Sequence, residues 1–155
     1  MKIRAVKIID GAAPIISCQS EISQIKLVSK RPLNGEEIRD IFRMISDKQI
    51  TLQLITVHIT QIVFSVPCLM AGAVMDLFSQ SEYRINAIND CAEVNISGVQ
   101  VSDVPQITGE IIETLSSLNV AILHLTTSQS SVSVLVEQAH LPAARNTIHA
   151  ALHLF

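Results

Sequence analysis

Few residues in this sequence have the types and spacing of a catalytic or metal site. Among the five histidines, His149 and His153 are spaced i, i+4 in an expected helix, a spacing that can hold zinc. No third ligand and no HExxH-like carboxylate accompanies them, so a solvated or packed helix face is the better interpretation. The hydroxyl-rich residues 126–131 lack the Gly-x-Ser-x-Gly turn that presents a nucleophile. We expect no catalytic residue, no metal and no cofactor.

The three cysteines do not form a recognisable redox or metal motif. Cys18, Cys68 and Cys91 are an odd number at wide spacings, which fits neither a disulfide framework nor a CxxC pair. We expect them to be small buried hydrophobic residues.

The charge balance argues against nucleic acid and membrane partners. The chain of 155 residues has 11 Lys and Arg against 14 Asp and Glu, a net charge of −3, without a polybasic stretch. Its apolar runs fall short of the roughly 18 residues that cross a bilayer. The N-terminal MKIRAVKIIDG has no uninterrupted apolar core of a signal peptide. We expect no nucleic acid, no membrane partner and a cytoplasmic location.

The composition and a repeat predict the fold class. Hydrophobic residues make up 48% of the chain but aromatic residues only 3%, so the core must consist of Ile, Val and Leu, which suit sheets flanked by helices. A shift of 70 residues places apolar residues on apolar residues, which indicates a duplicated unit. The matched sets are Ile41, Phe42, Ile45, Ile50, Leu52, Ile55, Ile62, Phe64 and Val66 on Ile111, Ile112, Leu115, Val120, Ile122, Leu125, Val132, Val134 and Val136.

Each copy shows the same order of periodicities. Alternating residues predict strands at 22–29 and 92–99, and helical spacing follows at 36–48 and 106–118. Two strands come next in each copy, at 50–57 and 59–66, and at 119–127 and 131–137, joined by short polar turns. A second helix is predicted at 67–80 and at 140–153, with Pro67 and Pro142 in the first turns.

The two copies differ in their last strand. Residues 83–89 complete a βαββαβ unit in the first copy, whereas the second copy ends in a helix and needs a strand from elsewhere. The N-terminal region has spare strands at 3–9 and 13–18. We therefore predict an α+β fold of two intertwined ferredoxin-like units with antiparallel sheets, with residues 83–89 open to exchange. The domains are expected at 1–21 (the completing strand), 22–89 and 90–155.

Both copies resemble the regulatory region of aspartate kinases. The stretch ITLQLITVHITQIVFSV at 50–66 is similar to the first regulatory domain of that family, where an INIDMI-like strand precedes one ending in FTV. Residues 91–155 are similar to its second domain, with NISGV, NVAILHLTTS, VSVLV and ALHLF in the family's order and spacing. The resemblance covers about residues 14–155 and implies a tandem pair of ACT domains.

The resemblance also implies where a ligand binds. In that family, paired ACT domains bind an end-product amino acid at the turn between the first strand and first helix, where helix amides hold a carboxylate. The second strand of a facing unit supplies the rest. Carried over to this chain, the effector-binding residues are Asn34, Gly35, Glu36, Glu37, Ile38, Gln53, Thr56, Val104, Pro105, Gln106, Thr127, Ser128 and Gln129.

The resemblance predicts an allosteric amino-acid-binding module that senses lysine, threonine or a related amino acid and forms a homodimer. The family's kinase domain, with its glycine-rich KFGGTS loop, is absent from this sequence, so we expect no enzyme activity. An aspartate kinase catalytic domain or subunit is the expected partner. Gln106 stands where the family has glycine, and the Asp-Lys-Pro-Gly turn is replaced by residues 33–36. The alternative is therefore a structural dimerisation module that has lost its ligand.

Overall fold

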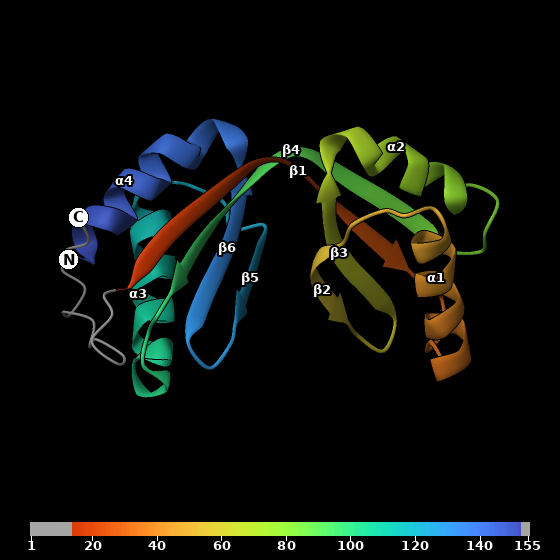
Figure 1. Ribbon diagram of the computed structural model, residues 1–155, viewed down its shortest axis with the longest axis horizontal. Helices are drawn as coiled ribbons and strands as arrows, with labels where there is room; N and C mark the ends of the chain where they lie inside the picture. The colour runs from red at the N-terminus through yellow and green to blue at the C-terminus, as the bar shows by residue number, and fades with distance from the viewer. Residues whose placement is uncertain (1–13, 153–155) are drawn as a thin grey trace. The chain divides into compact units, whose positions relative to one another are not determined.

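The computed structural model describes residues 14–152 as six strands, four α-helices and two short 3₁₀ helices (Figure 1). In chain order these are β1 (Ile15–Val28), α1 (Gly35–Asp47), β2 (Gln53–Val57), β3 (Gln61–Pro67), α2 (Cys68–Leu77), β4 (Arg84–Ser97), η1 (Val101–Asp103), α3 (Val104–Ser117), β5 (His124–Thr127), β6 (Ser131–Glu137), η2 (Gln138–His140) and α4 (Leu141–Ala151).

The chain divides into two compact units, and β1 and β4 each contribute to both. Residues 21–90 form the first unit, and residues 14–20 together with 91–152 form the second unit. The strands are hydrogen-bonded in the order β2-β3-β1-β4-β6-β5. Each unit therefore has four strands and two α-helices, which confirms the predicted α+β fold of two intertwined ferredoxin-like units.

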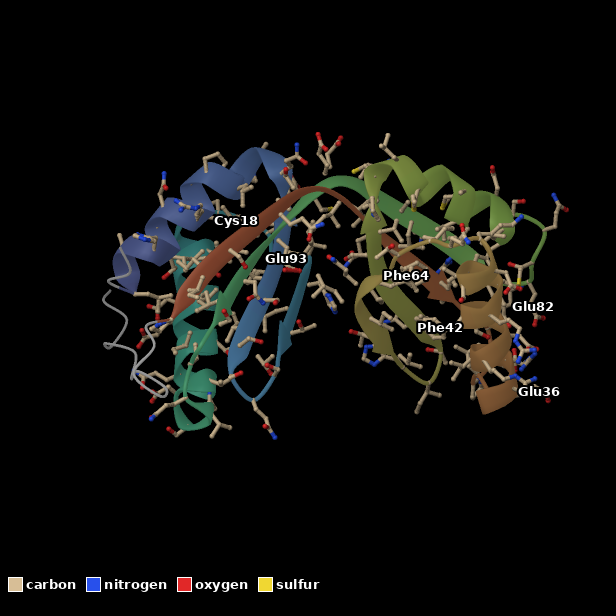
Figure 2. The ribbon with its side chains drawn as sticks, viewed as in Figure 1. Cys18, Glu36, Phe42, Phe64, Glu82 and Glu93 are labelled. Atoms are coloured by element: carbon tan, nitrogen blue, oxygen red, sulfur yellow. The ribbon has the colours of Figure 1, made fainter. Side chains whose placement is uncertain are left out.

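The first unit is organised around alternating residues on β1 and β3. Ile25 and Leu27 on β1 lie opposite Phe64 and Ile62 on β3, in an antiparallel register. All four side chains are buried with Ile41, Ile45, Ala71 and Val74 from α1 and α2. Phe64, labelled in Figure 2, is completely buried. Because successive strand residues face opposite sides, this alternation turns one face of the sheet toward the helices.

The second unit repeats this arrangement with a strand borrowed from the start of the chain. Val94 and Ile96 on β4 lie opposite Val134 and Val132 on β6, and both pairs are buried against α3 and α4. β4 has β1 as its other neighbour, and Ile16 of β1 packs against this core. The missing fourth strand therefore comes from residues 15–20, inside the region where the sequence placed spare strands.

Equivalent backbone contacts recur 70 residues apart. The amide of Ser29 donates to the Thr60 carbonyl at 2.8 Å, and that of Val99 to the Ser130 carbonyl at 3.0 Å. α1 and α3 both stop before a residue with positive φ, Gln49 (57°) and Asn119 (57°). A left-handed residue after the last turn lets backbone amides satisfy the final carbonyls of a helix.

Some details differ from the sequence-based expectation. The strands predicted separately at 83–89 and 92–99 are replaced by the single strand β4 over residues 84–97. Its residues 84–89 stay in the first unit instead of being exchanged. Pro67 ends β3 and precedes α2, because it lacks the amide that a further ladder bond would need. The possible strand at 3–9 and His153 lie outside the described residues.

Glu21 and Asp90 lie where β1 and β4 pass from one unit to the other. Their φ angles are 59° and 56°. A left-handed conformation at a residue other than glycine costs about 1 kcal/mol, so the surrounding ladder must hold both residues in place. Each long strand therefore contains a conformational break without losing its place in the sheet order.

Because the second unit needs β1, we can predict what happens when residues 90–155 are produced without it. Expressed alone, residues 90–155 should be insoluble, because the second unit then lacks β1 and exposes an edge of β4. As the control, residues 14–20 are joined by a short Gly/Ser linker after residue 155, which restores βαββαβ order within one segment. This permuted segment should be soluble. Soluble, cooperatively folded residues 90–155 without the added strand would contradict the assignment.

Candidate functional site

The N-terminus of α1 is closed by a reciprocal capping box. The amide of Glu37 donates to Asn34 Oδ1 at 2.8 Å, and the amide of Asn34 lies 3.5 Å from Glu37 Oε1. Asn34 is extended, with φ −94° and ψ 167°, as a capping residue requires. The Ile38 amide donates to the Asn34 carbonyl at 3.1 Å. This pattern fixes the first turn of the helix.

The Glu37 carboxylate is also held by side chains from two other segments. Arg31 donates to its two oxygens at 2.6 and 3.2 Å, and the Tyr83 hydroxyl donates to Oε2 at 3.0 Å. Arg31 also donates to Glu82 Oε1 at 3.2 Å. The Arg31 hydrogen bond holds the pKa of Glu37 below its usual value, and Tyr83 and Asn34 act in the same direction. The Glu37 carboxylate is therefore occupied by hydrogen bonds within the protein.

Two backbone contacts hold the loop before α1 against the β2–β3 turn. Besides the Ser29–Thr60 bond, the Leu33 amide donates to the Ile59 carbonyl at 2.8 Å. The loop is therefore fixed at both of its ends, which keeps the start of α1 in place without a ligand.

The remaining groups at this end of α1 are suited to an anion. Gly35 and Glu36 occupy the first two helical positions, so their amides have no acceptor within the helix. A Cβ added at Gly35 would meet no atom within 4 Å. The side chain of Glu36 is 77% exposed and its Oε1 lies 3.8 Å from Arg39 Nη2, so its carboxylate is accessible from solvent. Glu36 and Glu82 project from the same side of the first unit (Figure 2).

Gln53, the first of the two β2 residues of the predicted site, lies away from this helix end. β2 leads into the turn that contacts the loop before α1, but Gln53 starts the strand and lies four residues, about 13 Å, from its end at Val57. Gln53 is exposed and lies opposite Ser65, whereas Thr56 is half-buried and lies opposite Val63. Gln53 would therefore need a facing unit to meet a ligand held at α1.

The second predicted turn has a different structure. Residues 101–103 form η1 and α3 already starts at Val104, so Val104, Pro105 and Gln106 belong to its first turn. The Val104 amide donates to the Val101 carbonyl, and Pro105 has no amide N–H. Of the first three residues of α3, only Gln106 therefore has an amide N–H that could donate to a ligand. The Gln106 side chain bonds Glu110 at 3.2 Å along the helix. This end of α3 therefore offers an anion fewer donors than α1.

The hydroxyl-rich residues form the turn between β5 and β6. The Ser128 amide donates to the Ser131 carbonyl at 2.9 Å, and their hydroxyls lie 2.6 Å apart. Thr127 and Gln129 are exposed. The contacts that the serines make within the turn account for them without a ligand.

Cys91 is buried, but Cys18 is exposed and Cys68 half-buried, so the expectation that all three are buried is wrong. Cys18 lies in β1, within the strand predicted at 13–18. Among residues 14–152, no cluster of three or more potential metal ligands is found. Within the same range, no helix has both the length and the apolar character to cross a bilayer.

The sequence reveals one part of this site and conceals another. Asn34 and Glu37 have the spacing of a capping box, which can be read directly from the chain. Glu82 and Tyr83 are 51 and 46 residues from their partners Arg31 and Glu37, so no local pattern announces those contacts.

Comparison with known proteins places this geometry in a class. Residues 94–152 match the ACT domain family. The described fold is similar to the regulatory subunit of aspartate kinase from Thermus flavus, with a TM-score of 0.78 and 19% identity over 96% of this chain and 99% of that one. It is also similar to a structure of aspartokinase alpha and beta subunits, with a TM-score of 0.80 and 20% identity over 97% of this chain and 100% of that chain. The fold is that of paired ACT domains.

The sequence relatives agree with this class. Aspartokinase 1 of Bacillus subtilis is 22% identical over 148 residues, which are 96% of this chain and 35% of the relative. The chain therefore spans about a third of this curated relative. The predicted resemblance to the C-terminal regulatory region of aspartate kinases is confirmed.

The Glu37 contacts predict a pH-dependent contribution to stability. Because the folded pKa of Glu37 lies below its unfolded value, about 4.3, its stabilising effect is complete above that pH and is lost as the pH falls through the folded pKa. The difference in unfolding free energy between the wild type and Glu37→Gln, measured by denaturant titration, should shrink on acidification. Glu36→Gln is the matched control and should remain close to wild type. A pH-independent difference for Glu37→Gln would contradict this assignment.

Proposed function

We propose that the chain is a regulatory module that binds an amino acid at the N-terminus of α1 and passes this signal to an aspartate kinase catalytic domain or subunit. The ligand is an end product of the aspartate pathway, lysine, threonine or a related amino acid. The ligand's carboxylate lies at the Gly35 and Glu36 amides and its ammonium near the Glu36 carboxylate. Gln53 and Thr56 of a facing unit complete the site.

The observation that carries this proposal is the pair of uncommitted amides at a rigidly held helix start. A helix N-terminus attracts anions, and the capping box and the loop contacts order this one in advance. Val104, Pro105 and Gln106 at the start of α3 form a weaker site. Thr127, Ser128 and Gln129, which correspond to the end of β2 and the β2–β3 turn, are its remaining residues.

The competing function is a structural dimerisation module without a ligand. It is favoured by the state of Glu37, whose carboxylate is occupied by Arg31, Tyr83 and Asn34. A ligand that depended on Glu37 would have to break these contacts. The proposal instead assigns the ammonium to Glu36, and the two functions are separated by direct binding measurements.

A pair of substitutions at Gly35 tests the amide contact. Proline is well tolerated at the first helical position and Asn34 already has the extended backbone that precedes proline, so Gly35→Pro removes one donor and keeps the helix. In isothermal titration, at least one of lysine, threonine, methionine and diaminopimelate should bind both to the wild type and to Gly35→Ala. The same amino acid should bind Gly35→Pro about tenfold more weakly, because a hydrogen bond to a charged group is lost.

Two results would count against the proposal. Equal affinity of Gly35→Pro and Gly35→Ala would exclude the helix amide as a ligand contact. No heat and no shift in melting temperature with any of the four amino acids at millimolar concentration would favour the structural module.

We also propose a homodimer formed through the β2 edge. β2 ends the sheet order of the first unit, and Ile55 and Val57 are large apolar residues that are 49% and 44% exposed. An exposed apolar edge strand is a template for pairing with another chain. Val57→Lys should shift sedimentation toward monomer, whereas Leu69→Lys, an apolar-to-lysine change at a 99% exposed position on α2, should not. A wild type that sediments as a monomer at micromolar concentration would contradict the dimer.

A further inference from the structure

We propose that the first unit contains a second ligand site, for a small dianion, between the end of β1 and the start of β4. Two cavities lie there, of about 330 and 290 Å³, and both are lined by Ser29, Lys30 and Glu82. Arg31 lines the first cavity, and Val28 and Arg84 line the second. Lys30 and Arg84, whose charges the inference uses, are not part of the amino-acid site at α1, so the inference is independent of the proposed function.

The charge of this region selects an anion. Lys30, Arg31 and Arg84 face one acidic lining residue, Glu82, in a chain whose net charge is −3. Arg31 is engaged by Glu37 and Glu82, as described above. Among residues 14–152, no carboxylate forms an ion pair with Lys30 or Arg84. Their two positive charges are therefore available to a ligand.

Ser29 supplies a buried polar group to both cavities. Ser29 is only 9% exposed, and its Oγ accepts a hydrogen bond from the Arg31 amide at 3.3 Å. Within the described part of the chain, the hydroxyl proton has no acceptor. An oxyanion in the cavity would accept this proton.

The ligand class follows from these three groups. Two cations and one hydroxyl match an anion with two negative charges and several acceptor oxygens, such as a phosphate group or a dicarboxylate. Because Lys30 and Arg84 are exposed, the attraction is screened by salt and the affinity should fall as the ionic strength rises.

Isothermal titration of the full chain at low ionic strength tests this site, with inorganic phosphate and succinate as separate probes. At least one probe should bind, and Arg84→Ala and Lys30→Ala should each weaken it roughly fivefold. Binding of phosphate alone would support the site and identify a phosphate-bearing ligand, and binding of succinate alone would support it and identify a dicarboxylate. Arg43→Ala removes the same charge from an exposed position on α1 and should bind like the wild type.

Two outcomes would overturn the inference. One is the absence of binding of both probes at millimolar concentration. The other is an equal loss with Arg43→Ala and Arg84→Ala, which would show only a response to net charge. Amino-acid titration of Arg84→Ala separates the two sites, because its binding at α1 should be unchanged. The amino-acid test at Gly35 and the anion test at Lys30 and Arg84 can therefore succeed or fail separately.

Discussion

The constraint on which the structure depends is that the second copy of the repeat does not supply the fourth strand of its own sheet. The second copy ends in α4, so the free side of β4 would be an unpaired edge. Residues 15–20 of β1 occupy it, and the rest of β1 then begins the first unit. Backbone hydrogen-bonding groups must be paired or exposed to water, so this borrowing decides the topology of the whole chain.

The same principle of satisfying backbone groups shapes the helix ends. α1 uses Asn34 and Glu37 as reciprocal caps, and Arg31 and Tyr83 then neutralise and orient Glu37. α3 follows a 3₁₀ turn and has no side-chain cap. Duplicated units with the same fold therefore present unequal helix starts. The first has ordered amides and an exposed carboxylate, and the second has proline in place of one donor.

The sequence predicts most of the fold because the repeat, the alternation and the helical spacing are local signals. It places β6 correctly at residues 131–137 and anticipates a borrowed strand. It does not predict that β4 is continuous, because the left-handed residue Asp90 interrupts the alternation without ending the ladder. In the site, the capping box is readable, whereas the roles of Arg31 and Tyr83 depend on contacts between distant segments that only the folded chain creates.

An amino acid bound at the start of α1 would change the environment of the backbone amides there. This is measured most directly in a ¹H–¹⁵N correlation spectrum of the intact chain, recorded while lysine and threonine are added in turn. We expect saturable shifts at the Gly35 and Glu36 amides with one of them, with smaller or no shifts at Gln106. Unchanged Gly35 and Glu36 signals at saturating ligand, or shifts confined to the start of α3, would contradict binding at the start of α1.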